Sequence, residues 1–463
     1  MSNIKKDLTQ LTLFALVWPI FIESLLRILF GNVDTFMLSA YSDNAVAGVG
    51  AANQFISIII LMIQVVCSGS TIIISQYLGA ENRKRASEVA LVSIAFNMIL
   101  GLLISIVMFT CSSSLLKLMN FELEIYNYSK EFLTIIGSFS FIQALSITVS
   151  AILRSYGLVR YPMYVNMGAN ILNIFGNSIF IYGLFGMPVL GVKGVAISTI
   201  ASQLIGLVAI ILVLVKNVDM EFSIKKISSM PINIIKNVLK EIFKIGGPSA
   251  GESLSYNLSQ IVITAIIGTM GSYALTSRIY VFNLMFLIML ASISIGQGTQ
   301  IIVGRLVGAG KMDDAYKTCI RSLKIAIAVS FSVAVLFALS SSMLLGLFTD
   351  DPRILSVGRL LLFVTIFLEP GRAFNIVLGF SLRGAGDAKF ILILGLIFMW
   401  IVAVFMSYVL GIKLHLGLLG VWIAFALDEW IRGIFMLARW RSRAWENQSL
   451  TKPVKELVSV PEL

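Results

Sequence analysis

The chain has 463 residues, of which 58% are hydrophobic and only 13% are charged, and its formal net charge is +11. Soluble globular domains carry about a quarter charged residues, so this composition excludes a soluble protein and indicates a polytopic membrane protein. The three cysteines lie in apolar stretches without paired spacing, so no disulfide framework or metal site is indicated. The basic net charge does not require a nucleic-acid partner, because membrane topology accounts for it, as shown below.

Long apolar segments follow one another along the chain, each near or above the ~20 residues that a helix needs to cross the hydrocarbon core. Segments of this length leave helices as the only spanning structure. We predict six spans in the first half, at about 11–40, 46–77, 87–112, 130–154, 162–184 and 190–215. Six more are predicted in the second half, at about 243–268, 273–304, 315–347, 354–382, 389–411 and 417–439. The predicted fold class is therefore an all-α membrane protein with twelve transmembrane helices.

The second half of the chain repeats the first at a spacing of 229 residues. Matching pairs are Pro19 and Pro248, Glu23 and Glu252, Gly69 and Gly298, Gly79 and Gly308, and Arg154 and Arg383. This spacing is too long for a solenoid repeat and indicates two homologous, pseudo-symmetric bundles of six helices. We predict an N-lobe at 1–215, a cytoplasmic linker at 216–244 that lies on the membrane surface, a C-lobe at 245–440 and a cytoplasmic tail at 441–463.

The distribution of lysine and arginine predicts the orientation. Most basic residues fall in the termini and loops of one side, and the loops of the other side hold only Lys117, Lys130, Lys193, Arg353 and Lys413. Because cytoplasmic loops carry an excess of positive charge, we predict that both termini are cytoplasmic. Anionic headgroups of membrane lipid then balance the net basicity, and no nucleic acid is needed.

Asp34 is the acidic residue that the sequence singles out. It lies deep in the first apolar segment, with no basic residue three or four positions away, and its repeat counterpart is Ile263. Charge at membrane depth is costly and usually faces a cavity or a partner. We therefore predict a cation or proton site at Asp34. The alternative is an aspartate at the outer helix end that water and hydroxyl groups satisfy.

Other charges in the apolar segments are candidates for a substrate cavity or for structural ion pairs. Glu23 has Arg27 one turn later, which could partly neutralise it, whereas Glu252 has Tyr256 at the matching position. Arg278 and Arg372 could bind an anionic substrate group or neutralise Glu252 and Glu369. Asp428 and Glu429 lie in the last segment. The cavity candidates are Glu23, Arg27, Asn166, Asn170, Glu252, Tyr256, Arg278, Glu369 and Arg372.

Asparagines form a stripe in the fifth predicted helix. Asn166, Asn170, Asn173 and Asn177 are spaced by four, three and four residues and so share one helix face. An amide stripe is unfavourable against lipid, so this face should line a cavity or bond to other helices. Amide oxygens are also hard ligands that suit Na⁺.

Enzymatic motifs are missing from the sequence. The single histidine, His415, falls in a predicted outer loop, and there is no His-Glu-x-x-His, Walker A or Gly-x-Ser-x-Gly motif. We therefore predict a non-enzyme that uses no cofactor beyond a coupling ion.

Several motifs resemble those of the multidrug and toxic compound extrusion (MATE) family. They are Asn32-Val33-Asp34-Thr35, Gln76-Tyr77-Leu78-Gly79-Ala80 and Leu382-Arg383-Gly384-Ala385-Gly386-Asp387. The resemblance covers about 10–445. It implies a V-shaped antiporter that exports organic, often cationic, compounds in exchange for H⁺ or Na⁺.

The resemblance also implies a cation-coupling site at Asp34, Asn173, Asn177 and Thr199. Position 177 is asparagine here, where many members have aspartate, which removes one charge. A second site, which one branch of the family builds from acids in helices seven and ten, falls on Tyr256 and Arg372. That site is therefore expected to be absent, although Glu252 and Glu369, each about one turn earlier, could substitute for these acids.

From these observations we expect a drug or toxic-metabolite efflux antiporter in the bacterial plasma membrane. Its partners would be small organic substrates and membrane lipid, it would act as a monomer, and it would bind no metal except possible Na⁺ at Asp34. The alternative is a flippase for lipid-linked precursors, in which Arg27, Arg278 and Arg372 would hold a pyrophosphate.

Overall fold

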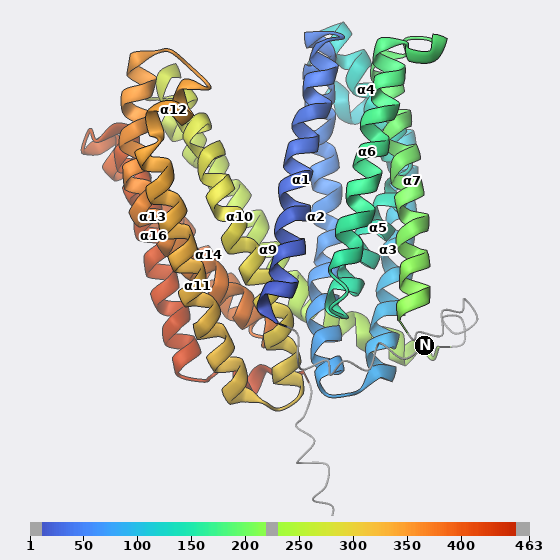
Figure 1. Ribbon diagram of the computed structural model, residues 1–463, viewed down its shortest axis with the longest axis vertical. Coiled ribbons are helices and arrows are strands. Elements are labelled where there is room, and N and C mark those ends of the chain that lie inside the picture. The colour runs from blue at the N-terminus through green and yellow to red at the C-terminus, as the bar shows by residue number, and fades with distance from the viewer. Residues whose placement is uncertain (1–11, 219–229, 451–463) are drawn as a thin grey trace, which may run out of the picture. The chain divides into compact units, whose positions relative to one another are not determined.

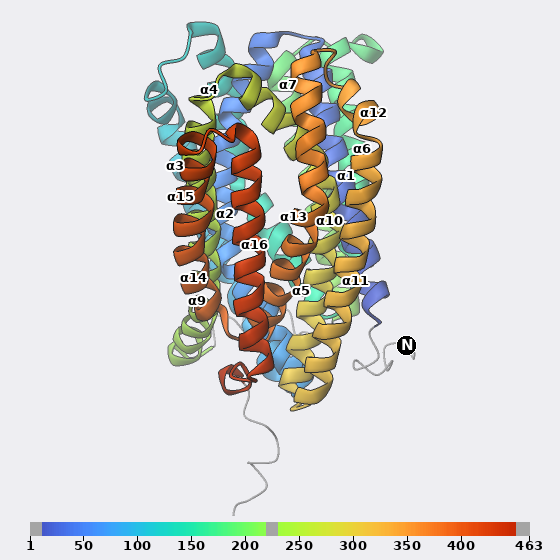
Figure 2. The same cartoon turned by 90° about the vertical axis from the view of Figure 1, so that its left-hand side faces the viewer.

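The computed structural model describes residues 12–218 and 230–450, and these residues form an assembly of long helices (Figures 1 and 2). The first half contains α1 (Leu13–Ser39), α2 (Asp43–Gly79), α3 (Arg83–Lys117), α4 (Leu123–Ser138), α5 (Ser140–Ser155), α6 (Arg160–Tyr182), the short helix η2 (Leu184–Gly186) and α7 (Gly191–Asn217). Helices α4 and α5 form one segment that bends by 53° at its break.

The second half begins with α9 (Ile232–Gly268), α10 (Ser272–Gly308), α11 (Met312–Leu339), the short α12 (Ser341–Gly346) and α13 (Pro352–Gly384). One further segment combines α14 (Ala388–Phe398), the π-helical η3 (Met399–Val404), α15 (Phe405–Tyr408) and the π-helical η4 (Val409–Lys413). The last long helix is α16 (Gly417–Arg441), followed by the short η5 (Glu446–Gln448). Figure 2 shows α16 beside α13, with which it packs extensively.

Within the described residues, eight helical segments are long and apolar enough to cross a membrane, and the bent α4–α5 pair is a ninth. Helices α6, α9 and α16 are also long, but the asparagines of α6 and the charged residues of α9 and α16 lower their hydropathy. The protein is thus an all-helical, polytopic membrane protein, as the sequence predicts.

The linker between the halves is shorter than the predicted 216–244. Helix α9 begins at Ile232, directly after Pro231, and continues without a break through Pro248. Residues 232–244 are therefore the first turns of a long helix, and part of the remaining linker, 219–229, lies outside the described residues. Pro19 likewise lies within a continuous α1.

The chain forms two compact units whose boundaries differ from those of the sequence halves. The N-terminal unit is Ile22–Ile74 with Arg83–Gly246, and the C-terminal unit combines the described parts of Met1–Phe21, Ser75–Asn82 and Gly247–Leu463. Each boundary inside a first helix falls next to a proline, after Phe21 in α1 and before Gly247 in α9. The first turns of each half's first helix therefore pack in the unit formed mostly by the other half.

Glycines explain this exchange, because they let helix backbones approach closely. In the N-terminal unit, a Cβ on Gly246 of α9 would lie 2.0 Å from the carbonyl oxygen of Val65 in α2. In the C-terminal unit, Gly298 of α10 packs on Val17 of α1. Val17 is the repeat counterpart of Gly246. The first helix of one half thus packs on the second helix of the other half, twice, in related ways.

A reciprocal glycine contact joins the ends of α2 and α10 within the C-terminal unit. A Cβ on Gly79 would lie 1.9 Å from the carbonyl oxygen of Arg305, and a Cβ on Gly308 would lie 1.9 Å from that of Gln76. Gly79 and Gly308 are repeat counterparts, so one pair of backbones meets at two symmetric points. Any side chain larger than hydrogen would force these backbones apart.

We expect Gly79→Ala and Gly308→Ala each to lower the stability of the folded protein by about 1–3 kcal/mol, because the added methyl group overpacks a backbone contact. The matched control is Gly50→Ala on the exposed face of α2, where an added Cβ meets nothing within 4 Å. That variant should be neutral or more stable, since alanine favours a helix over glycine. Thermal unfolding in detergent measures all three, and a Gly308→Ala protein as stable as the Gly50→Ala control would contradict the close contact.

Candidate functional site

Asp34 lies on α1 inside the N-terminal unit and faces side chains of α6 and α7. Nδ2 of Asn177 donates a hydrogen bond of 2.9 Å to Oδ1 of Asp34. The favoured orientation of the Asn173 amide places its Nδ2 at 3.0 and 3.3 Å from the two carboxylate oxygens and its Oδ1 at 3.1 Å from the Thr199 hydroxyl. The structure thus brings together Asp34, Asn173, Asn177 and Thr199, the four residues predicted to form the coupling site.

A close approach of α6 and α7, which lie side by side in Figure 1, holds these groups in place. A Cβ on Gly176 would lie 2.2 Å from Oγ of Ser198, so only glycine fits there. The Ser198 hydroxyl donates to the backbone carbonyl of Asn173 at 2.9 Å. This bond fixes Asn173 opposite Thr199, the residue that follows Ser198.

Asn177 keeps one acceptor unused. Its side chain is fully buried, and its Oδ1 has no hydrogen-bond partner among the described residues. A buried polar atom without a partner is costly and calls for an explanation such as a bound ion or water. The free oxygen belongs to the amide whose nitrogen binds Asp34, so it would reach a cation at the carboxylate only if this amide turned over.

The N-terminal part of the asparagine stripe binds a different acid. Nδ2 of Asn166 donates to Oε1 of Glu23 at 2.7 Å, whereas Asn170 bonds to the backbone carbonyl of Asn166. Glu23 and Asp34 are eleven residues apart on α1, and Asn166 and Asn177 are eleven apart on α6. The two helices therefore run parallel, and one asparagine face serves both acids.

Glu23 forms an ion pair with Arg154 of α5, not with the neighbouring Arg27. The Arg154 guanidinium donates to Oε1 of Glu23 at 2.5 Å. In the other unit, Arg383 of α13 pairs with Glu252 at 3.2 Å. Both members of the second pair are repeat counterparts of the first, so the duplicated structure retains one ion pair in each half.

Glu369 and Arg372 belong to a buried charge network of the C-terminal unit. Arg372 pairs with Glu369 at 2.5 Å and with Glu429 at 3.3 Å. Arg432 pairs with Asp428 and with Glu429, and Asn375 donates to Glu429 at 2.6 Å. Within this network, Arg372 neutralises Glu369, which is one of the two roles that the sequence left open for it.

Arg278 and Tyr256 lie apart from Glu252. The Arg278 guanidinium donates to the hydroxyl of Thr264 and, at 3.0 Å, to the amide oxygen of Gln260. Arg278 therefore does not neutralise Glu252. Arg383 takes that role instead. Tyr256 lines a cavity of only about 20 Å³ beside Arg372 and Asp428. Arg27 lies exposed on α1.

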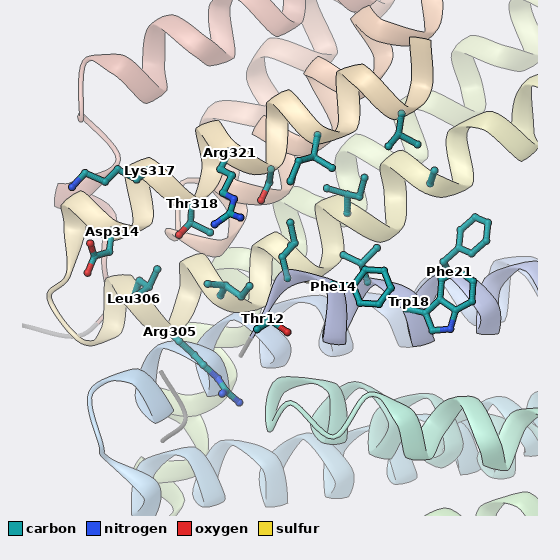
Figure 3. A pocket seen from close by; sticks show the side chains of 18 of the residues that line it. Thr12, Phe14, Trp18, Phe21, Arg305, Leu306, Asp314, Lys317, Thr318 and Arg321 are labelled. Carbon is teal, nitrogen blue, oxygen red and sulfur yellow. The ribbon is translucent and has the colours of Figure 1, made fainter. Parts of the chain in front are cut away.

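A much larger groove, of about 880 Å³, lies elsewhere in the C-terminal unit (Figure 3). Residues of α1, α10 and α11 form most of its walls, and none of the nine residues proposed from sequence for a substrate cavity lines it. The charged residues that line it are Arg305, Asp314, Lys317 and Arg321, so its charge differs from that expected of a site for cations.

Comparison of the acids in the apolar segments distinguishes Asp34 from the rest. Among the described residues, Glu23, Glu252, Glu369, Asp428 and Glu429 each form an ion pair with an arginine, whereas Asp34 forms none. Its partners are neutral amides. No fixed positive charge therefore holds Asp34 ionised, and binding of a proton or a metal cation can neutralise it.

The arginines that complete the ion pairs were not predicted from the sequence. Arg154 and Arg383 were recognised as repeat counterparts but not as partners of Glu23 and Glu252, although all four keep the same register. That shared register was the available signal, since residues that must pair are duplicated together. No comparable signal marked Arg432 or Asn375.

Comparisons with known proteins agree with the fold and the repeat. A sequence profile of the family described as MatE matches residues 19–179 and 248–409. YisQ of Bacillus subtilis (strain 168), described as an uncharacterized transporter, is 48% identical over 434 residues, covering 94% of each chain. NorM of Thermotoga maritima, described as a probable multidrug resistance protein, is 29% identical over 460 residues, which cover 99% of this chain and 97% of NorM.

Solved structures share the same fold. One, of a multidrug resistance MATE family transporter in an outward-facing conformation, matches with a TM-score of 0.86 at 22% identity and covers 96% of this chain and 98% of the other. A transporter of the MOP superfamily from Pyrococcus furiosus matches with a TM-score of 0.85 at 21% identity, over 95% of this chain and 96% of the other. At these identities the matches establish the fold alone.

We expect the Glu23–Arg154 pair to contribute as a unit to stability. Glu23→Gln and Arg154→Gln should each cost about 1–3 kcal/mol, because each leaves one charge uncompensated, and the double variant should cost clearly less than their sum. Glu23→Gln combined with Arg160→Gln, an exposed arginine at the start of α6, is the control and should be additive. Thermal unfolding of these four variants, of Arg160→Gln alone and of the wild type tests this. Additive effects at Glu23 and Arg154 would exclude the pair.

Proposed function

Because this chain belongs to the MATE family of transporters, we propose that it is a secondary active antiporter that exports organic, often cationic, compounds in exchange for H⁺ or Na⁺. Membership of the family makes the protein an integral membrane transporter and not an enzyme. The exported compounds, the coupling ion and the direction of transport are part of the proposal. The observation that carries it is the absence of an ion pair at Asp34 among the described residues.

We assign the coupling role to Asp34, with Asn173, Asn177 and Thr199 as its surroundings. An intramembrane carboxylate without a fixed counter-charge is costly, so it gains most from a cation delivered by solution. A proton needs only the carboxylate itself. Na⁺ would also need neutral oxygen ligands, which the amide of Asn177 and the hydroxyl of Thr199 could supply.

A single carboxylate favours H⁺ over Na⁺ in this proposal. With asparagine at position 177, the site carries one negative charge, and one proton cancels it fully. Na⁺ must lose its hydration shell, and a second carboxylate would help to repay that cost. The amide of Asn177 gives partial compensation only.

In the proposed cycle, the coupling cation and the organic substrate bind in a mutually exclusive way. Occupation of Asp34 by a cation removes its charge and weakens its hydrogen bonds to Asn173 and Asn177. A change in these bonds shifts the equilibrium between states that differ in how α1 packs on α6, and the substrate is released to the outside. The ion gradient then supplies the free energy for export. Following the distribution of basic residues, we place both termini on the cytoplasmic side.

The flippase alternative finds less support in the geometry. A pyrophosphate site requires arginines whose charge and N–H donors are both free. Arg372 is held by Glu369 and Glu429, and Arg278 already bonds to Thr264 and Gln260. These contacts leave Arg27 as the remaining member of the proposed ring.

We expect Asp34→Asn to abolish ion-driven transport, because an amide cannot exchange a charge with the coupling ion. The measurement is transport of a fluorescent cationic dye in proteoliposomes, with a pH gradient and a Na⁺ gradient imposed separately. Asp43→Asn, which changes an exposed acid at the start of α2, is the matched control and should transport at about the wild-type rate. Gradient-driven transport by Asp34→Asn at the wild-type rate would refute the assignment.

A further inference from the structure

The large groove of the C-terminal unit has an apolar end and a basic end (Figure 3). Its apolar end is built by the first turns of α1, where Phe14, Trp18 and Phe21 follow one another along the helix. The rings of Phe14 and Trp18 stack at 6.2 Å, as do those of Trp18 and Phe21. Phe14 is 74% exposed and Trp18 is 53% exposed, so this aromatic stripe is open to the surroundings.

The opposite wall is α11, and it supplies the basic end. Lys317, Thr318 and Arg321 lie on consecutive turns and line the groove, while Ile325 and Val329 continue the wall towards its apolar part. Figure 3 shows the Arg321 guanidinium directed to the groove near Thr318. Helix α11 has 28 residues and is about 42 Å long, whereas the hydrocarbon core is about 30 Å thick. Its first turns therefore extend to the depth of lipid headgroups.

The charges at the basic end are unbalanced. Lys317 and Arg321 are exposed, and neither forms an ion pair or a side-chain hydrogen bond with any part of the chain that the structure describes. The other charged residues that line the groove are Arg305, which is buried, and Asp314. The neighbouring Asp313 pairs with Arg443. Two exposed cations, Lys317 and Arg321, thus face one carboxylate, which favours an anionic ligand.

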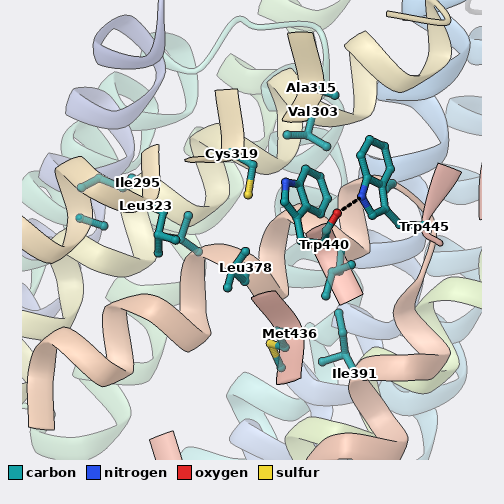
Figure 4. Packing of buried hydrophobic residues seen from close by; sticks show 14 of the residues in the cluster. Ile295, Val303, Ala315, Cys319, Leu323, Leu378, Ile391, Met436, Trp440 and Trp445 are labelled. Atoms are coloured by element: carbon teal, nitrogen blue, oxygen red, sulfur yellow. Dashed lines mark hydrogen bonds between the residues drawn. The ribbon is translucent and has the colours of Figure 1, made fainter. Parts of the chain in front are cut away.

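Packing on the other face of α11 fixes the direction of these side chains. Ala315, Cys319 and Leu323 are buried in a core cluster that contains Trp440 and Trp445 (Figure 4). The two indole rings stack at 4.2 Å, and Trp445 donates to the backbone carbonyl of Trp440 at 2.9 Å. Because this face is anchored, Lys317 and Arg321 must project from the opposite side, towards the groove and the membrane.

We propose that this groove binds one anionic phospholipid. The phosphate of the headgroup lies against Arg321, Lys317 and the Thr318 hydroxyl, and an acyl chain lies along the aromatic stripe of α1 and along Ile325 and Val329. Guanidinium and ammonium groups bind phosphate well, and aromatic side chains are favoured where headgroups meet hydrocarbon. The positive end disfavours an organic cation, so the groove is distinct from the substrate site of the proposed transport cycle. It equally disfavours the chain's own N-terminal residues, which include Lys5 and Lys6.

The test is native mass spectrometry of the full-length protein in detergent, titrated with phosphatidylglycerol. We expect the wild type to bind this lipid tightly. The double variant Lys317→Gln/Arg321→Gln should bind it more weakly by about ten-fold or more, because two phosphate contacts are lost. Lys324→Gln, which removes an exposed lysine of α11 outside the groove, is the matched control and should bind like the wild type. Val329→Trp, which fills the apolar part, should also weaken binding while leaving the basic end unchanged.

Two further arms identify the ligand. Phosphatidylcholine with the same acyl chains should bind about ten-fold more weakly than phosphatidylglycerol, and inorganic phosphate should not displace the lipid. Equal binding of the two lipids would overturn the proposal of an anionic headgroup, and displacement by phosphate alone would show a site for a free anion.

A double variant that binds phosphatidylglycerol like the wild type would show that lipid lies elsewhere and that the groove has another occupant, such as the N-terminal residues or an organic cation. Retained thermal stability of the variants confirms that each one is folded.

Discussion

The cost of a carboxylate at membrane depth governs the arrangement of this protein. Five of the six acids that lie away from the ends of its apolar segments are matched by arginines within the described residues, and their charges are thereby fixed. Asp34 alone among these acids has neutral partners, the amides of Asn173 and Asn177. An acid with a fixed counter-charge stabilises the folded bundle. An acid without one can change its charge more easily, and for that reason we assign the coupling role to Asp34.

The duplication separates structural residues from those that we assign to function. The pairs Glu23–Arg154 and Glu252–Arg383 occupy equivalent positions, as do the glycines at 79 and 308, and they hold helices together in both halves. The counterpart of Asp34, by contrast, is Ile263, which is fully buried in an apolar cluster. Symmetry is thus kept where packing demands it and lost at Asp34, where we propose that a charge responds to a ligand. The groove that we propose for a phospholipid is equally one-sided, because the repeat counterparts of Lys317 and Arg321 are Glu88 and Val92.

Much of this organisation could be predicted from the sequence. Apolar runs of twenty or more residues admit one spanning structure, so the all-helical membrane fold followed from length alone. Grouping of Asp34 with Asn173, Asn177 and Thr199 came from the family resemblance, and the helical spacing of the asparagines placed them on one face. Contacts between distant segments were harder to predict. Arg154 lies 131 residues from Glu23, and nearby Arg27 was the more obvious partner on sequence. The start of α9 was predicted too late, at about 243, because Pro231 and the polar residues after it resemble a linker although they precede and begin a helix.

The claim that Asp34 exchanges a coupling cation for an organic substrate can be tested most directly by binding. The affinity of the purified protein for a fluorescent cationic dye should be measured by fluorescence polarisation over a range of pH, with and without Na⁺, for the wild type and for Asp34→Asn. Our account predicts that dye binding to the wild type weakens as the coupling cation becomes more concentrated, with about one cation displaced per dye, and that this dependence disappears in Asp34→Asn. The same cation dependence in both proteins would contradict it.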